Sequence, residues 1–223
     1  MGIIQLIMTI RFRALFIVFL LPCFGLSQNS KQDSLQSIEQ DSIVAWSFNV
    51  AADYYIFPGD QNILMLTTMA DRKMLHLEAR YNYEERNTAS AFVGMNFSFG
   101  NQLQLTITPM AGIVFGNLNG LAPGLETDLS YKMFYFNSQS EYVFDFSEQE
   151  NNFAYTYLQL GANVLKNFDL GIAAQRTRLF ETSLELQRGV YATYTFRKLS
   201  GTFTYFNPFT DSYFFVASLS IDF

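Results

Sequence analysis

The chain has 223 residues, a length that allows one domain with a sizeable sheet. Aromatic residues make up 17% of it and charged residues only 15%, well below the usual quarter of a soluble domain. The formal net charge of −6 and the lack of a basic cluster argue against a nucleic-acid-binding protein, which needs positive charge to contact phosphates.

Residues 1–27 have the organisation of a secretory signal peptide. Arg11 and Arg13 precede an apolar run at residues 14–21, and small residues follow it. We expect cleavage after Ser27, which leaves a mature chain with a formal charge of −6 − 2 = −8. A membrane anchor is the alternative, although the run is shorter than the roughly 18 residues that a spanning helix needs.

The single cysteine, Cys23, lies inside this segment. A lipoprotein signal would use it, but Pro22 directly before it fits that signal poorly. Without Cys23 the mature chain has no thiol, which excludes disulfides, zinc–thiolate sites and cysteine nucleophiles. The single histidine, His76, likewise excludes multi-histidine metal sites, so we expect no metal and no cofactor.

Residues 28–43 are polar and rich in Ser, Gln and Asp, with no sustained apolar period. This composition predicts a flexible periplasmic tail. From residue 44 to residue 223 apolar side chains instead alternate with small or polar ones, and this period of two is typical of β-strands with two different faces.

The alternation predicts an all-β fold with about twelve strands, although ten or fourteen remain possible because predicted boundaries shift by several residues. The strands are expected near residues 44–56, 62–70, 73–84, 90–99, 102–115, 124–136, 138–146, 153–164, 167–178, 183–196, 199–206 and 212–223.

Short and long connections alternate along these strands. The tight turns are expected near residues 71–72, 100–101, 137, 166 and 197–198. The longer loops are expected near residues 57–60, 85–87, 116–123, 147–152, 180–182 and 207–211. Short turns on one side and long loops on the other predict a closed antiparallel transmembrane β-barrel over residues 44–223, with both termini in the periplasm.

A soluble β-barrel or sandwich would also alternate, but with its apolar face inward and a charged exterior. Here the polar positions are often Gly, Ser, Thr, Asn or Gln. Aromatic residues near strand ends, Tyr81 and Tyr83 among them, suit the aromatic girdles of a membrane barrel.

The signal peptide, the alternating strands and the final segment SYFFVASLSIDF, which ends on Phe223, resemble the outer-membrane β-barrel superfamily of Gram-negative bacteria. The leader end Ser27-Gln28 resembles leaders of the Bacteroidota. The resemblance implies outer-membrane lipid and lipopolysaccharide as surroundings. It also implies that the barrel-assembly machinery reads Phe223 as an assembly signal. It indicates no particular substrate.

Eleven ionisable residues are expected on inward-facing positions and are candidates for lining a lumen. They are Asp53, His76, Glu78, Arg80, Glu84, Glu126, Asp128, Lys132, Glu141, Asp145 and Glu185. They line an aqueous path or ligand pocket, or else they neutralise one another in an interior filled by side chains. Acids outnumber bases among them, so an open path would favour cations.

Three arginines fall on positions expected to face lipid. Arg176 and Arg178 lie at the outer end of their strand, where they could contact lipopolysaccharide phosphates. Arg188 lies deeper in its strand, so either a β-bulge near Gly189 turns it inward or the assumed register is in error.

These features favour a narrow passive pore or uptake channel with a cation-leaning lumen. The alternative is a non-conducting structural or interaction barrel, such as an accessory subunit of an envelope complex. A lipid-modifying enzyme is a third hypothesis. The outer-membrane phospholipase pattern, however, places Ser two residues after His. Glu78 occupies that position after His76, so we expect no enzyme.

Overall fold

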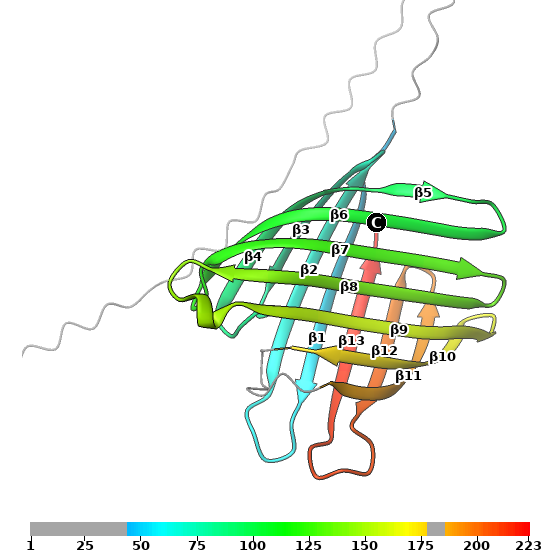
Figure 1. The fold of residues 1–223 in the computed structure, drawn as a ribbon. Helices are drawn as coiled ribbons and strands as arrows, with labels where there is room; N and C mark the ends of the chain where they lie inside the picture. The colour runs from blue at the N-terminus through cyan, green and yellow to red at the C-terminus, as the bar shows by residue number, and fades with distance from the viewer. Residues whose placement is uncertain (1–43, 178–185) are drawn as a thin grey trace, which may run out of the picture. The chain divides into compact units, whose positions relative to one another are not determined.

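A computed structural model describes residues 44–177 and 186–223 (Figure 1). The predicted signal peptide and tail lie outside these residues. The described residues form thirteen strands and one short 3-10 helix, Gln149–Asn151. The strands are β1 (Ser47–Ile56), β2 (Ile63–Arg72), β3 (Leu75–Tyr81), β4 (Thr88–Met95), β5 (Phe97–Phe99), β6 (Leu103–Gly116), β7 (Gly120–Tyr131), β8 (Phe134–Asp145), β9 (Phe153–Leu165), β10 (Phe168–Arg176), β11 (Gln187–Phe196), β12 (Leu199–Phe206) and β13 (Phe214–Asp222).

The strands close into one antiparallel barrel. Apart from β4 and β5, neighbours in sequence pair with each other, and β13 returns to pair with β1 from Ile56↔Phe215 to Asn49↔Asp222. In Figure 1 the red strand β13 accordingly lies beside the blue strand β1. Because β4 and β5 both pair with β6, they share one position, and the barrel has twelve strand positions. The predicted all-β barrel of about twelve strands is confirmed.

The break between β4 and β5 has a local cause on the neighbouring strand. Both segments keep one register against β6, with Gly94↔Met110 before the break and Phe97↔Ile107 after it. That register places Pro109 opposite Met95, and proline has no N–H to donate to the ladder. The predicted strand 90–99 is therefore one strand position with a short interruption.

The predicted turn near Asn137 is wrong. The turn lies at Lys132 and Met133, and Lys132 adopts the positive φ of 54° that a two-residue hairpin turn requires. Asn137 instead lies inside β8, where its side chain donates a hydrogen bond to Asp128 on β7. Asparagine is common in turns, but here a hydrogen bond to the neighbouring strand holds Asn137 in the sheet.

The predicted long loop 116–123 is also wrong. Only residues 117–119 separate β6 from β7, and Pro123 lies within β7, paired with Ala111. The side chain of Asn119 closes this turn, because it accepts a hydrogen bond from the Gly116 N–H and donates one to the Gly116 carbonyl. Because the Asn119 side chain provides these hydrogen bonds, the turn is much shorter than the Gly and Pro residues of this segment suggest.

The two faces of the barrel differ in polarity. Along β3, Leu75, Leu77 and Tyr81 are exposed on the outside, whereas His76, Glu78 and Arg80 are buried inside. Large exposed apolar side chains recur on the outer face of the strands, for example Ile113, Leu121, Ile172, Val190 and Phe203. A soluble barrel has the opposite arrangement. Among the described residues no helix is long and apolar enough to cross a membrane.

The interior differs between its two ends. Near the long loops the inward side chains are buried, whether they are aromatic, such as Tyr55 and Phe206, or polar, such as Gln175 and Gln187. Near the short turns they are small and polar and remain accessible, such as Ser98 on β5, Asn163 on β9 and Ser220 on β13. The interior is therefore open toward the short turns and constricted toward the long loops.

Candidate functional site

A buried charged cluster in the barrel interior takes its side chains from β3, β7 and β8 and from the connection after β3. We call it the Arg80 cluster, and its members are Arg80, His76, Glu78, Glu84, Glu126 and Glu141. The period of two along β3 sends His76, Glu78 and Arg80 to the inner face together. Closure of the barrel then brings Glu126 from β7 and Glu141 from β8 to the same guanidinium.

Arg80 contacts all four glutamates of the cluster. Its Nη2 lies 2.7 Å from Glu78 Oε2 and 3.6 Å from Glu126 Oε1. Its Nη1 lies 2.9 Å from Glu141 Oε2 and 3.8 Å from Glu84 Oε1. The Arg80 side chain is 1% exposed, so its charge interacts in a region of low dielectric, where charge–charge energies are large.

Aromatic rings cover the guanidinium. Its central carbon lies 4.2 Å from the ring centroid of Tyr83 and 4.4 Å from that of Phe92, both within cation–π range. Ser90 donates a hydrogen bond to Glu84 Oε1 at 2.6 Å. The cluster is thus a packed ionic core, and removal of its one arginine would leave buried acids without a counter-charge.

A hydrogen-bonded chain continues from His76 toward the short turns. His76 Nδ1 donates to Asp71 Oδ1 at 2.8 Å, since a carboxylate can only accept. Asp71 also accepts a hydrogen bond from Asn96 Nδ2 at 2.7 Å, and Asn96 Oδ1 accepts one from Thr108 at 2.6 Å. These bonds fix the imidazole with its Nε2 toward Glu78, 3.8 Å away.

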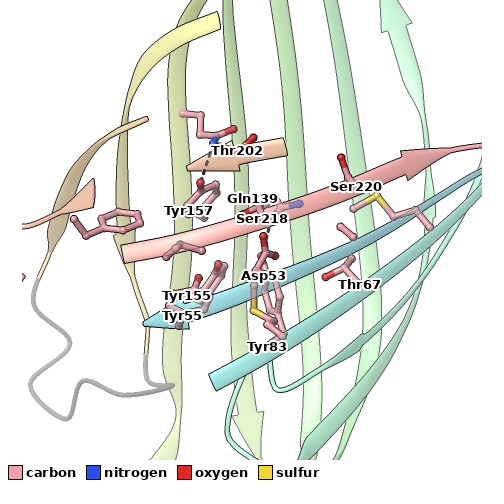
Figure 2. Close-up of a pocket in the computed structure, with 16 residues that line it drawn as sticks. Asp53, Tyr55, Thr67, Tyr83, Gln139, Tyr155, Tyr157, Thr202, Ser218 and Ser220 are labelled. Atoms are coloured by element: carbon pink, nitrogen blue, oxygen red, sulfur yellow. Dashed lines mark hydrogen bonds between the residues drawn. The ribbon is translucent and has the colours of Figure 1, made fainter. Parts of the chain in front are cut away.

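A cavity of about 210 Å³ lies beside the Arg80 cluster (Figure 2). Among its lining side chains, Asp53 and Thr67 come from β1 and β2, Thr202 and Ser218 come from β12 and β13, and Tyr157 comes from β9. The cavity is therefore a product of barrel closure. Its lining combines apolar side chains, such as Met65, Phe206 and Val216, with hydroxyl, amide and carboxylate groups.

Tyr83 and Gln139 separate this cavity from the Arg80 cluster. The Tyr83 hydroxyl donates to Gln139 Oε1 at 2.6 Å, and Gln139 Nε2 donates to Glu126 Oε1 at 3.0 Å. Both residues line the cavity as well. A solute in the cavity would consequently contact a hydrogen-bonded relay that ends on a carboxylate of the cluster.

An aromatic layer borders the cavity on the side of the long loops, and two of its members, Tyr55 and Phe206, line the cavity. We define this closing layer as Tyr55, Phe57, Phe206 and Phe214. Ring centroids are 6.1 Å apart for Tyr55 and Phe57, 5.1 Å for Phe57 and Phe214, and 4.9 Å for Phe206 and Phe214. Phe206 is 1% exposed and Phe214 is 2% exposed, so little solvent reaches this layer.

Comparison with solved structures identifies the fold. A KdgM porin superposes with a TM-score of 0.53 at 11% sequence identity, over 79% of this chain and 98% of the porin. A KdgM porin in complex with disordered oligogalacturonate gives the same TM-score and identity, over 79% of this chain and 99% of the porin. The chain has the β-barrel fold of the KdgM porin.

A further solved structure, the outer membrane protein Omp33 of Acinetobacter baumannii, is similar at a TM-score of 0.46 and 11% identity, over 81% of this chain and 98% of that protein. No protein-family model and no curated protein sequence matches the chain. The likeness to the porins accordingly concerns the fold alone.

The structure distributes the eleven predicted lumen residues over several places in this porin fold. Six of them form the Arg80 cluster, and Asp53 lines the cavity. Asp128 faces inward near the short turns, where it accepts a hydrogen bond from Asn137. Lys132 lies in the β7–β8 turn and not on the inner face, because the strand ends one residue before it. Glu185 lies outside the described residues.

Asp145, the last residue of β8, takes part in the loop that follows. Its Oδ1 accepts a hydrogen bond from the Ser147 N–H at 2.6 Å and from the Glu148 N–H at 3.4 Å. Its backbone N–H in turn donates to Asn152 Oδ1 at 2.8 Å. These contacts give Asp145 a structural place at the mouth of the barrel, away from the Arg80 cluster.

Two of the three arginines predicted to face outward, Arg176 and Arg188, lie near the long-loop ends of β10 and β11. Arg176 Nη1 donates to the Ala154 carbonyl at 3.1 Å, and Arg178 lies outside the described residues. Arg188 keeps a regular register with Ala174, so no bulge turns it inward. Because β11 begins at Gln187, Arg188 lies at the strand end, where an outward charge costs little.

Sequence reasoning missed the aromatic part of the interior. Tyr83 was expected on the outside, but Asn82 adopts a φ of 58° and ends the alternation of β3. Tyr83 and Glu84 are consequently both buried. The sequence could have placed Phe206 and Phe214 inside the barrel. Each lies two residues from an inward-facing residue of its strand, Thr204 and Val216 respectively, and so belongs to the same face.

His76 does not have the surroundings of a catalytic base. Its two ring nitrogens face Asp71 and Glu78, and among the described residues no serine or threonine hydroxyl hydrogen-bonds to it. A Ser–His hydrolase needs that contact. The porin fold and this geometry provide no support for the lipid-modifying enzyme.

Proposed function

We propose that the chain is a β-barrel of the bacterial outer membrane that forms a narrow passage for small polar solutes, with a preference for cations. The observation that carries the proposal is the pairing of an apolar outer face with a polar and acidic inner face in a closed barrel. Apolar groups on the outside are stabilised by lipid, and a closed barrel leaves no unpaired strand edge in the bilayer.

The lengths of the connections support an orientation. The turns at residues 73–74, 132–133, 166–167 and 197–198 have two residues each, whereas the connection at residues 57–62 on the other side is longer. Outer-membrane barrels have short periplasmic turns and longer outer loops. We therefore infer that the short turns and both termini lie in the periplasm and the long loops outside, where Arg176 and Arg178 could contact lipopolysaccharide phosphates.

The passage would run from the accessible polar end, through the cavity, to the closing layer. Asp53 and the glutamates of the Arg80 cluster give this route a negative potential, which attracts cations and repels anions. We infer that this passage is narrowest at the closing layer, where Phe206 and Phe214 are almost fully buried. Conduction through the wild-type barrel is accordingly expected to be small.

Planar-bilayer recordings of the refolded mature chain test the passage. Replacing Phe206 and Phe214 together by Ala removes two rings of the closing layer, so the single-channel conductance should rise several-fold and remain cation-selective. The matched control is Phe203→Ala with Phe215→Ala. This stacked pair lies on the same two strands but on the outer face, with centroids 5.5 Å apart.

The outcome of these recordings separates two candidate functions. If the inner double variant and the wild-type barrel are both silent in correctly folded samples, the passage does not exist. The second candidate would then hold, a non-conducting structural or interaction barrel such as an accessory subunit of an envelope complex. The near-complete burial of the Arg80 cluster favours it, because charged residues that line an open pore contact water.

A further inference from the structure

We propose that His76, Glu78 and Glu126 bind one divalent transition-metal cation inside the barrel. One ligand atom from each of the three side chains lies within 4.8 Å of the other two. In a tetrahedral site with bonds of about 2.0–2.2 Å, ligand atoms are about 3.4 Å apart, so rotamer adjustments of about an ångström would complete the site.

Two buried ligand atoms lack hydrogen-bond partners. His76 Nε2 and Glu78 Oε1 have none, although their side chains are only 4% and 0% exposed. Buried polar atoms in proteins nearly always have a partner, and an unsatisfied one is costly. Glu78 binds Arg80 through Oε2, so its Oε1 can bind a cation without loss of that ion pair.

The surroundings of His76 are those of a metal-binding histidine. Its Nδ1 donates to the Asp71 carboxylate, and Asp71 is held in turn by Asn96. A carboxylate on one ring nitrogen fixes the tautomer, orients the other nitrogen and raises its basicity as a ligand. The side chain of Asp71 is 35% exposed, so the site has a path to the open end of the barrel.

The acidic composition of the Arg80 cluster also favours a cation. Four glutamate carboxyl groups lie within 4.0 Å of one guanidinium, so one arginine cannot balance all of them as carboxylates. A buried carboxyl group without a counter-charge is neutralised by a proton or by a bound cation. A divalent ion would supply that charge without any additional residue.

The ligand set indicates the class of ion. One imidazole nitrogen and two carboxylate oxygens, without a thiolate, suit Zn²⁺, Co²⁺, Ni²⁺ or Mn²⁺ better than the all-oxygen ligand sets of Ca²⁺ and Mg²⁺. Because His76 and Glu78 lie on β3 and Glu126 on β7, the ion would connect two strands that are not neighbours in the sheet.

The test uses Co²⁺ titration of the folded mature chain, purified without a polyhistidine tag, followed by visible absorption and then competition with Zn²⁺. We expect saturable binding of one Co²⁺ per chain that Zn²⁺ displaces. Because the chain has a single histidine, the imidazole NMR signals of labelled protein report on His76 alone and should shift on Zn²⁺ binding. This readout needs no variant.

The variants distinguish a built site from general acidity. His76→Gln and Glu126→Gln should each weaken binding by at least about tenfold, and Asp71→Asn should weaken it by about tenfold. Glu141→Gln is the matched control, because Glu141 is a buried partner of Arg80 but not one of the three ligands, and it should retain binding. No saturable binding, unshifted His76 signals, or equal losses in Glu126→Gln and Glu141→Gln would overturn the proposal.

Discussion

Deletion of residues 212–223 is expected to abolish the folded barrel completely. Strand β13 pairs with β12 on one side and with β1 on the other, over eight residue pairs each. Its loss opens the barrel and leaves two strand edges unpaired. In the hydrocarbon core each unsatisfied backbone group costs several kcal/mol, so no partial barrel can compensate. Deletion of Phe223 with this strand would also remove the proposed assembly signal.

The deletion is checked by the heat-modifiable gel mobility of the chain in outer-membrane fractions. Deletion of residues 28–43 is the control, because this predicted tail precedes the first strand, and it should leave mobility and location unchanged. A truncated chain without residues 212–223 that still reached the outer membrane with heat-modifiable mobility would contradict the closed barrel.

Replacement of Arg80 by Met should have the largest effect of any single substitution in the interior. The guanidinium contacts Glu78, Glu84, Glu126 and Glu141, so its removal leaves four buried carboxylates close together without their main counter-charge. Breaking a buried ion pair typically costs about 3–5 kcal/mol of unfolding free energy, and a shared partner makes the upper part of that range the expectation.

Urea unfolding of the refolded barrel in lipid vesicles measures this loss. Lys198→Met is the control, because Lys198 lies exposed in the β11–β12 turn and should change the unfolding free energy by less than about 0.5 kcal/mol. Adding Glu78→Gln and Glu141→Gln to Arg80→Met should recover part of the loss, since neutral amides remove the repulsion. If Arg80→Met were as stable as Lys198→Met, the Arg80 cluster would not hold the interior together.

The period of two in the sequence accounts for much of the fold. It assigns opposite faces of the strand to neighbours such as Leu77 and Glu78. Once Glu78 is assigned to the inner face, His76 and Arg80 must lie on that face as well. The sequence could not show that Glu126 and Glu141 meet the same arginine. That contact depends on the curvature and register of a closed barrel and not on local spacing.

The sequence predicted the wrong turn or the wrong face where a few contacts outweigh the local amino-acid composition. Asn137 looks like a turn residue but is held in β8 by Asp128, while Lys132 forms the turn with a positive φ. Asn82 likewise ends the alternation before Tyr83, which sends that ring toward Arg80. The turn or strand propensity of a single residue predicts its conformation poorly where a hydrogen bond from a neighbouring strand, or a residue with positive φ, fixes the backbone.

Nitroxide accessibility along β6 tests most directly whether lipid covers the outer face of this barrel. The chain has one cysteine, Cys23, within the predicted signal peptide, so single cysteines in the mature chain can be spin-labelled without background. In liposomes, labels at the outward positions 105, 107, 111 and 113 should collide with oxygen, which concentrates in lipid. Labels at the inward positions 104 and 106 should collide with a water-soluble nickel chelate. Labels at the outward positions that collide with the nickel chelate, or no alternation along the strand, would contradict a membrane-embedded barrel.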